Sequence, residues 1–425
     1  MLQYTWMSST DPIKSRRIRG IDICRSAAIL AAMLSHTMIA FQLQRFTGIP
    51  SAGVRCIIQM APPVFITLFG AMLEIAYRPR FVRGDAEGAS RQLLNRAVQC
   101  YLLYVISLAA LVLTGKYSLL FAIRSALLDG VSPFTDILKF YALALLIAPL
   151  LIKIRVRFGL LSLLIFAIAV HAAYPLIKHI PAVHAEYGKF LLGFLYGSES
   201  AHVGGPSFLH GMTFVVCGMI IGYGIVGLFS KDARIRRSSA AWVGGLFILA
   251  VGSTAALLSW AASGSTITGI ANMQLRNENH PFWYSLGLTS VVIFVLFCVW
   301  VFDVLEHRWA DGICFIGKAS LFTFCFGNVL LYVFSGHVEN RHQSVELSAF
   351  FFALIILQSW VFHYLATREI TAASRNLMAI AVQRIVSGSK SSIAGLVSRP
   401  GSIYAHILWG QMPDTYDRDG KGDHA

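Results

Sequence analysis

The chain has 425 residues, of which 56% are hydrophobic and only 13% are charged. A soluble domain carries about a quarter of its residues as charged side chains, so this composition excludes a soluble globular protein and predicts a polytopic membrane protein. The net charge is +14, but the basic residues are scattered among short loops, which indicates topology signals and contact with anionic lipid and not nucleic-acid binding.

Ten apolar runs are long enough to cross a membrane as helices, so the predicted fold is all-α. In chain order the runs occupy residues 22–42, 56–76, 94–114, 134–152, 158–176, 208–229, 240–262, 282–304, 313–335 and 346–367. The segments 115–130 and 187–197 are too short or too polar to span, and we expect them to be interfacial or re-entrant. Three regions are predicted: a cytoplasmic segment at 1–19, a transmembrane domain at 20–370, and a cytoplasmic basic segment with a tail at 371–425.

Basic residues alternate between the loops and set the orientation. Groups of them precede the first run, follow the second, and recur at 153–157 and 231–237. The alternate loops carry only one or two basic residues each and are rich in histidine instead. The positive-inside rule therefore predicts that both termini are cytoplasmic.

The region after the last run alternates basic and apolar residues. Arg375, Arg384, Lys390 and Arg399 are spaced between apolar side chains. This pattern suits a helix lying on the anionic inner leaflet, and a partly ordered basic tail explains it equally well. The final residues, PDTYDRDGKGDHA, predict disorder.

The first run contains two residues that are costly in hydrocarbon, Arg25 and His36. They are eleven residues apart, which places them on nearly the same helix face and about 16 Å apart along the axis. With the N terminus inside, Arg25 lies at the cytoplasmic edge, where it can bind an anionic donor such as the phosphates of a coenzyme. His36 lies beyond the midplane and can take a proton from a hydroxyl acceptor. The pair indicates acyl transfer, although a snorkelling arginine and a helix-packing histidine would give the same pattern.

The phrase RIRGIDICRSAAILAAMLSH (17–36) contains this arginine and histidine with ten residues between them. It resembles the opening helix of the acyltransferase-3 superfamily of integral membrane acyltransferases. Further similar phrases follow in the family's order: PPVFITLFGAMLEIAYRPR (62–80), RQLLNRAVQCYLLY (91–104), DILKFYALALLIAPLL (136–151), LHGMTFVVCGMIIG (209–222) and IGKASLFTFCFGNVLL (316–331). The last phrase resembles OpgC-type glucan succinyltransferases in particular.

The resemblance implies that His36 is the catalytic base and that Arg25 is a partner of the acyl donor. It implies acyl-CoA as a cytoplasmic co-substrate with no bound cofactor, a glycan acceptor outside, and a location in a bacterial inner membrane. Three departures leave the subfamily and the acyl group, acetyl or succinyl, open. Ser35 stands where OpgC-type members have an aspartate, Asn328 stands near a histidine of many members, and Phe69 replaces a serine before Gly70.

Several other residues are candidates for substrate binding. On the donor side they are Asp22 and Glu74, which could pair with Arg25, and Arg91 and Arg96, which topology alone also explains. On the acceptor side they are Asn279, His280 and Trp283, because amide and aromatic groups together suit sugar recognition; an aromatic membrane belt would look the same. The histidines and cysteines lack companions at ligand spacing, so we predict no metal site.

The preferred interpretation is a membrane O-acyltransferase for an exported or cell-envelope glycan, in which His36 deprotonates a sugar hydroxyl that attacks a thioester. One alternative is a transporter or flippase for a glycan or lipid-linked substrate, with Arg25 binding substrate and His36 relaying protons. Inverted repeats with broken helices would favour that alternative, but Pro62 and Pro63 have no matching break in the second half of the chain. A non-catalytic membrane component of polysaccharide assembly is the third possibility.

Overall fold

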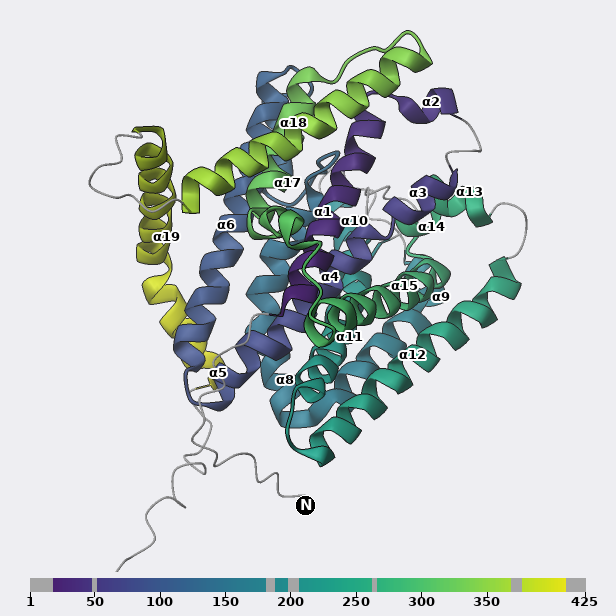
Figure 1. Cartoon of the computed structure of the whole chain (residues 1–425), viewed down its shortest axis with the longest axis vertical. Helices are drawn as coiled ribbons and strands as arrows, with labels where there is room; N and C mark the ends of the chain where they lie inside the picture. The colour runs from purple at the N-terminus through teal and green to yellow at the C-terminus, as the bar shows by residue number, and fades with distance from the viewer. Residues whose placement is uncertain are drawn as a thin grey trace, which may run out of the picture.

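The computed structural model describes residues 18–47, 52–180, 188–197, 206–261, 266–367 and 377–409. These residues form helices, turns and loops with no strand among them, which confirms the predicted all-α fold (Figure 1). Most of the predicted cytoplasmic segment 1–19, and residues 368–376 and 410–425 of the C-terminal region, lie outside the described residues.

Eight helices of the described residues are long and apolar enough to cross a membrane, or nine if one bent pair counts as a single span. The bent pair joins Asp311–Lys318 to Ser320–Phe334 at 75°. The long helices are α1 (Arg19–Ala40), α6 (Ala86–Leu113), α8 (Asp136–Ala172), α11 (Phe208–Leu228), α12 (Ala233–Ala261), α15 (Pro281–Val299) and α18 (Arg341–Thr367). The eighth span, Gly53–Val82, is built from α3 (Ala52–Ile58), α4 (Ala61–Met72), the π-helix η2 (Leu73–Tyr77) and α5 (Arg78–Val82).

Shorter helices connect the spans. The segments predicted to be interfacial, 115–130 and 187–197, contain only α7 (Leu119–Ala126) and α10 (Lys189–Tyr196). The remaining elements are α2 (Leu43–Thr47), α9 (Tyr174–Lys178), α13 (Thr266–Ala271), α14 (Gln274–Asn277), η3 (Trp300–Val304), η4 (Asp311–Ile313), α16 (Cys314–Lys318) and α17 (Ser320–Phe334).

The predicted spans 134–152 and 158–176 lie together in α8, which breaks at Gly159. Its φ of +81° is a conformation that side chains other than glycine adopt at a cost. Phe140 before the break and His171 after it both contact the start of α11. A Cβ atom on Gly211 would lie 2.5 Å from the Phe140 ring, and His171 Nε2 lies 3.1 Å from Thr213 Oγ1. The two limbs therefore return to the same end of the bundle, so α8 is a helical hairpin that accommodates both predicted spans.

Helix α1 lies in the middle of the bundle, where it packs against α4, α15, α16, α17 and α18 (Figure 1). Its first turn is held by Asp303, whose carboxylate accepts hydrogen bonds from the backbone amides of Arg19 (2.8 Å) and Gly20 (2.7 Å). A carboxylate at a helix N-terminus satisfies free N–H groups and complements the helix dipole. This contact between distant parts of the chain fixes the position of Arg25 and His36 along the bundle axis.

Glycines bring α4 and α11 unusually close together. A Cβ atom on Gly70 would lie 1.9 Å from the Val215 carbonyl oxygen, and one on Gly218 would lie 2.0 Å from the Thr67 carbonyl oxygen. Small residues at such contacts let membrane helices pack backbone against backbone, where van der Waals contact stabilises them without a hydrophobic driving force. The pair forms a rigid wall behind α1.

The predicted basic amphipathic segment forms helix α19 (Leu377–Trp409), which packs along α6. Ile393 and Val397 are buried, and Gly401 lies against Arg91. Ile385 and Leu396 on the rest of the helix are more than 70% exposed. The helical form agrees with an amphipathic segment, while its placement on the inner leaflet stays a prediction.

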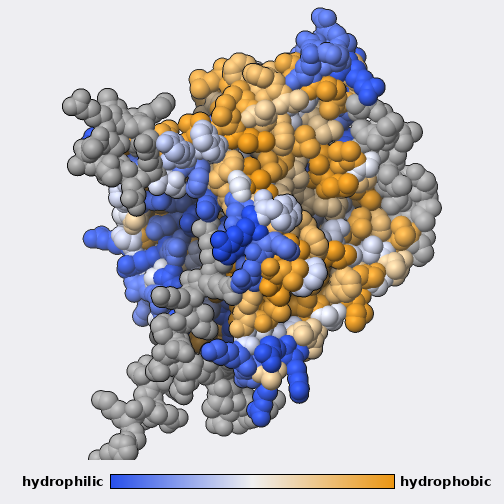
Figure 2. All heavy atoms as spheres, viewed as in Figure 1, coloured by the Kyte–Doolittle hydropathy of each residue, from blue (hydrophilic) through white to orange (hydrophobic). Residues whose placement is uncertain are grey.

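Apolar side chains cover much of the outer surface, including the outward faces of α12 and α18 (Figure 2). Hydrophilic residues gather at the turn between α11 and α12 and at the loop before α18, at the two ends of this surface (Figure 2). The first of these ends also carries Arg19, Arg80, Arg91 and Arg155, and we call it the basic end. The multiple apolar helices make the chain an integral membrane protein.

We expect the basic end to face the cytoplasm, because basic loops are retained on that side of the membrane. A single cysteine at Asn340, an exposed residue of the opposite end, should react with an impermeant thiol reagent in intact cells, in a background without the seven native cysteines. A cysteine at Ser230, in the turn between α11 and α12, should react only after permeabilisation. The reverse labelling pattern would invert the orientation.

Candidate active site

His36 projects from α1 toward α17, where it meets Asn328. The distance between His36 Nδ1 and Asn328 Oδ1 is 2.8 Å. The amide nitrogen of Asn328 donates to the Phe324 carbonyl oxygen at 2.7 Å, so the amide oxygen is the atom that faces the imidazole. An oxygen acceptor there requires the hydrogen on Nδ1, which leaves Nε2 with a free lone pair. The contact thus sets the tautomer in which His36 can accept a proton.

Aromatic rings fix the plane of the His36 imidazole. The Phe134 ring is stacked on it with centroids 4.6 Å apart, and the Phe324 ring meets it edge-on at 5.7 Å. Phe134 is held in turn by Tyr332, whose ring stacks on it at 5.6 Å and whose hydroxyl accepts a hydrogen bond from the Phe134 amide at 3.2 Å. The imidazole is therefore oriented on three sides by α17 and by the loop before α8.

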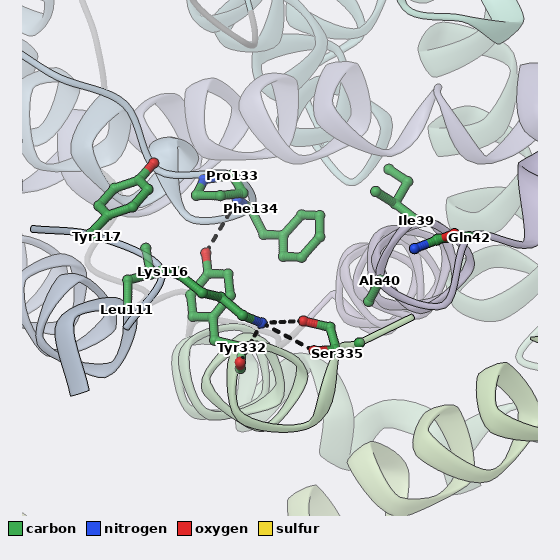
Figure 3. A pocket seen from close by; sticks show the side chains of 11 residues that line it. Ile39, Ala40, Gln42, Leu111, Lys116, Tyr117, Pro133, Phe134, Tyr332 and Ser335 are labelled. Atoms are coloured by element: carbon green, nitrogen blue, oxygen red, sulfur yellow. Dashed lines mark hydrogen bonds between the residues drawn. The ribbon is translucent and has the colours of Figure 1, made fainter. Parts of the chain in front are cut away.

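A pocket of about 360 Å³ lies one turn beyond His36, toward the end opposite the basic end. Ile39 and Ala40 of α1, Phe134 and Tyr332 line it together with Lys116 (Figure 3). The ammonium group of Lys116 donates to the Tyr332 carbonyl oxygen and to Ser335, and partial burial lowers the Lys116 pKa. Phe134 lines this pocket and also stacks on the His36 ring, so one aromatic side chain lies between the pocket and the imidazole.

Arg25 lies near the basic end of α1 and is partly exposed. Its guanidinium is within electrostatic range of the hydroxyl groups of Tyr77 in η2 and Tyr141 in α8. Arg80 and Arg96 lie within the same range of Tyr77. Among the residues that the structure describes, Arg25 forms no hydrogen bond and no ion pair. Arg80 is already paired with Asp85 at 2.7 Å. Arg25, a cation with its donors unused, is suited to binding an anion together with Arg96.

Arg25 and His36 face the same neighbouring segment. Arg25 is within electrostatic range of Tyr141, and His36 stacks on Phe134, seven positions earlier in the sequence, just before α8. The unbroken α1 keeps the two side chains about 16 Å apart, as eleven residues of α-helix require. A basic group at one end of the bundle and a proton acceptor deeper inside therefore lie along the same side of α1, beside the start of α8. We call this line from Arg25 to His36 the seam.

Residues 17–194 match the model of the heparan-alpha-glucosaminide N-acetyltransferase catalytic family. No curated protein matches the chain. The match supports a membrane acyltransferase type of family, and it covers Arg25, His36 and Phe134. The narrower resemblance to the acyltransferase-3 superfamily and to OpgC-type enzymes stays a prediction.

The predicted donor-side residues differ in their surroundings. The sequence predicts that Glu74 could pair with Arg25, but the buried Glu74 pairs with other arginines. Arg155 donates to its carboxylate at 2.9 and 3.2 Å, and Arg78 lies 3.3 Å away. Asp22 is also buried, and its pairing with Arg25 stays a prediction. Arg91 is bound to Glu87 and to Ser402 of α19. Arg96 is exposed beside Tyr77, so it is the one of the four that extends the cluster around Arg25.

The predicted acceptor-side residues form hydrogen bonds and packing contacts within the protein. The Asn279 amide oxygen accepts hydrogen bonds from the Ser207 backbone and the Tyr284 hydroxyl, both at 2.8 Å, and Asn279 is 3% exposed. The His280 side chain caps α15 through the Phe282 amide. Trp283 is fully buried against Phe214 and Tyr284. These contacts explain the amide and aromatic pattern without a bound sugar.

Other residues of the site were not assigned a role from the sequence. Phe134 is the first residue of the predicted run 134–152, Lys116 lies in the predicted interfacial segment 115–130, and Asn328 differs from a family pattern; none of these features indicates a role at the site. Arg276 of α14 lies within electrostatic range of His36. Burial lowers the pKa of the Arg276 guanidinium to about 10, which leaves it charged at neutral pH.

Proposed function

We propose that this protein moves an acyl group of the acetyl or succinyl class from acyl-CoA to a nucleophilic group of an exported or cell-envelope glycan. The basic end faces the cytoplasm and receives the donor, and the pocket at the opposite end receives the acceptor. The observation that carries the proposal is the pairing, on one helix, of an uncommitted arginine with a histidine held in its proton-accepting tautomer.

The donor is held first by its phosphates. Arg25 and Arg96, which both lie within electrostatic range of Tyr77, give this part of the basic end a positive charge that favours phosphate groups. The extended pantetheine arm of coenzyme A separates its phosphates from its thioester, and the seam from Arg25 to His36 separates the cation from the base in the same way. The thioester carbonyl then lies at the imidazole.

Transfer begins when Nε2 of His36 takes the proton of the acceptor. The acceptor oxygen or nitrogen forms a bond to the thioester carbon, and the carbonyl π electrons move onto its oxygen. When that oxygen re-forms the carbonyl, the C–S bond breaks and the coenzyme leaves as a thiolate, which takes the proton from His36. Asn328 stabilises the imidazolium that exists between the two proton transfers, because its amide oxygen accepts from Nδ1 in both states.

The acceptor atom distinguishes two versions of this activity. The resemblance to glucan acyltransferases favours a hydroxyl group, whereas the name of the matching family model specifies N-acetyl transfer to a glucosaminide. The chemistry at His36 serves either atom, since both must lose a proton as they attack.

The test is transfer of a labelled acyl group by the purified protein in detergent. We expect labelled acetyl-CoA or succinyl-CoA to acylate a saccharide that ends in glucose or in glucosamine, and mild alkali will distinguish the labile ester from the stable amide. Donor and acceptor offered separately serve as controls. Failure of both donors with both acceptors, by protein that is folded and monodisperse, would rule out the proposed activity with these substrate classes.

A further inference from the structure

Arg276 is a charged residue within electrostatic range of His36, at the end of the bundle where we place the acceptor. Arg276 lies in α14, between α13 and α15 at the end opposite the basic end. Its guanidinium is within electrostatic range of the His36 imidazole, of the Tyr284 hydroxyl and of the Asp136 carboxylate. These groups come from α1, α15 and α8, so three different helices carry groups within electrostatic range of Arg276.

The hydrogen bonds of Arg276 leave most of its capacity unused. Nη1 lies 3.5 Å from the Gln59 side-chain oxygen, and Nη2 lies 3.0 Å from the Met273 sulfur. Both partners are neutral, and the buried Nε has no hydrogen-bond partner. In the described part of the chain, no carboxylate lies within ion-pair distance of Arg276. Arg276 is partly buried, and a cation that loses part of its hydration is stabilised by a nearby anion, because that loss costs free energy.

The carboxylate within electrostatic range of Arg276, that of Asp136, already serves another cation. Asp136 Oδ1 lies 3.3 Å from the ammonium group of Lys139 and accepts a hydrogen bond from the Ser132 amide at 2.9 Å. Lys139 itself is fully buried and also donates to the Gly130 carbonyl oxygen. Asp136 and Lys139 neutralise each other through Asp136 Oδ1, while Oδ2 has no hydrogen-bond partner in the described part of the structure. A bound anion would therefore add a partner that Arg276 lacks among the described residues.

We propose that Arg276 is an anion-binding residue of the active site, which holds an oxygen anion of the reacting complex beside His36. This inference rests on the proposed acyl transfer. The anion has two possible sources with the same chemistry: the oxyanion that forms when the nucleophile attacks the thioester carbonyl, or a carboxylate carried by the acceptor glycan. A guanidinium suits both, because its planar N–H groups bind oxygen anions in pairs.

The two sources predict different kinetics. An oxyanion exists only after attack, so a residue that holds it lowers the barrier for every acceptor, and the loss of one such donor costs about 10²–10³ in kcat. A carboxylate on the acceptor is present from the start, so a residue that holds it acts on KM and only for charged acceptors.

The experiment compares Arg276→Gln, Arg276→Lys and a matched control, Arg55→Gln. Arg55 is also a partly buried arginine at this end, with a weak bond to a glutamine amide (3.4 Å to Gln44) and an unpartnered Nε, but it does not act electrostatically on His36. Each variant is assayed with a neutral glucose disaccharide and with the same disaccharide carrying one carboxylate as a uronic acid. Calorimetric binding of both disaccharides without donor is measured in parallel.

If the anion is the oxyanion, Arg276→Gln should lower kcat about a hundredfold with both disaccharides, and Arg276→Lys should restore part of it. If the anion belongs to the acceptor, Arg276→Gln should raise KM and weaken calorimetric binding for the carboxylated disaccharide alone. Unchanged kinetics and binding in folded Arg276→Gln, or an equal loss in Arg55→Gln, would overturn the proposal. Normal carboxylate-dependent binding by a wild type that transfers nothing would instead refute the proposed function and leave the anion subsite standing.

Discussion

The His36→Asn variant should bind acyl-CoA almost as tightly as the wild type and transfer the acyl group at least about a hundredfold more slowly. Asparagine is polar and can keep a hydrogen bond to Asn328, but it has no nitrogen that accepts a proton from an attacking group. Donor affinity should survive because the phosphates bind near Arg25, about three turns away along α1. The measurements are equilibrium binding of acyl-CoA and single-turnover transfer in detergent.

His171→Asn is the matched control for that experiment. His171 is another partly buried histidine on a spanning helix, and it is hydrogen-bonded through one ring nitrogen to Thr213 at 3.1 Å. It does not contact His36, so its variant should transfer at close to the wild-type rate if it folds. Near-normal transfer by folded His36→Asn would show that His36 is a packing residue, and the proposed mechanism would be wrong.

The spanning helices could be predicted because hydropathy and helix length are local properties of the sequence. The same is true of the spacing between Arg25 and His36, which depends only on the period of an α-helix. The two limbs of α8 correspond to the predicted apolar runs 134–152 and 158–176, and the structure adds the glycine conformation at Gly159 that permits the reversal. The division of these helices into α3, α4 and η2, or α16 and α17, was not foreseen, because short breaks do not interrupt an apolar run.

The partners of the predicted residues could not be foreseen, since they come from distant parts of the chain. Asn328 is 292 positions from His36, and nothing in the spacing of either residue indicates that they meet. Glu74 was expected to be within reach of Arg25 because both lie near one end of the membrane. The helix packing gives it to Arg155 instead, 81 positions away. A charge in a membrane helix predicts that a partner exists, but the identity of the partner depends on the packed fold.

On the acceptor side, residue type alone does not distinguish a sugar site from the packed core. Asn279 and Trp283 have side chains suited to a sugar site, but both are buried. The Asn279 amide oxygen accepts a hydrogen bond from the Ser207 backbone, and Trp283 packs in the core at the start of α15. Arg276, three residues before Asn279, lies within electrostatic range of the candidate base, but no feature of the sequence distinguishes it from the other arginines between spans. Burial distinguishes the two cases, and burial is set by tertiary structure.

Arg25→Ala should weaken acyl-CoA binding by about 1.5–3 kcal/mol, the usual contribution of a hydrogen bond to a charged group, which corresponds to roughly a ten- to hundredfold rise in Kd. The fold should tolerate the change, because Arg25 has no hydrogen bond or ion pair among the described residues that would be left unsatisfied. Wild-type affinity should also fall with added salt more steeply than that of the variant, since the contact is between charges.

Arg91→Ala is the control on the same end of the bundle. Arg91 is exposed and already bound to Glu87 and Ser402, so its removal should change the free energy of donor binding by no more than about 1 kcal/mol, the range of surface ion pairs. Both variants are compared by calorimetry with acyl-CoA and with dephosphorylated acyl-pantetheine, which lacks the anionic groups. Arg25→Ala should lose affinity for the first ligand only. If Arg91→Ala loses that affinity and Arg25→Ala keeps it, the donor lies between α6 and α19, and the seam from Arg25 to His36 is not its path.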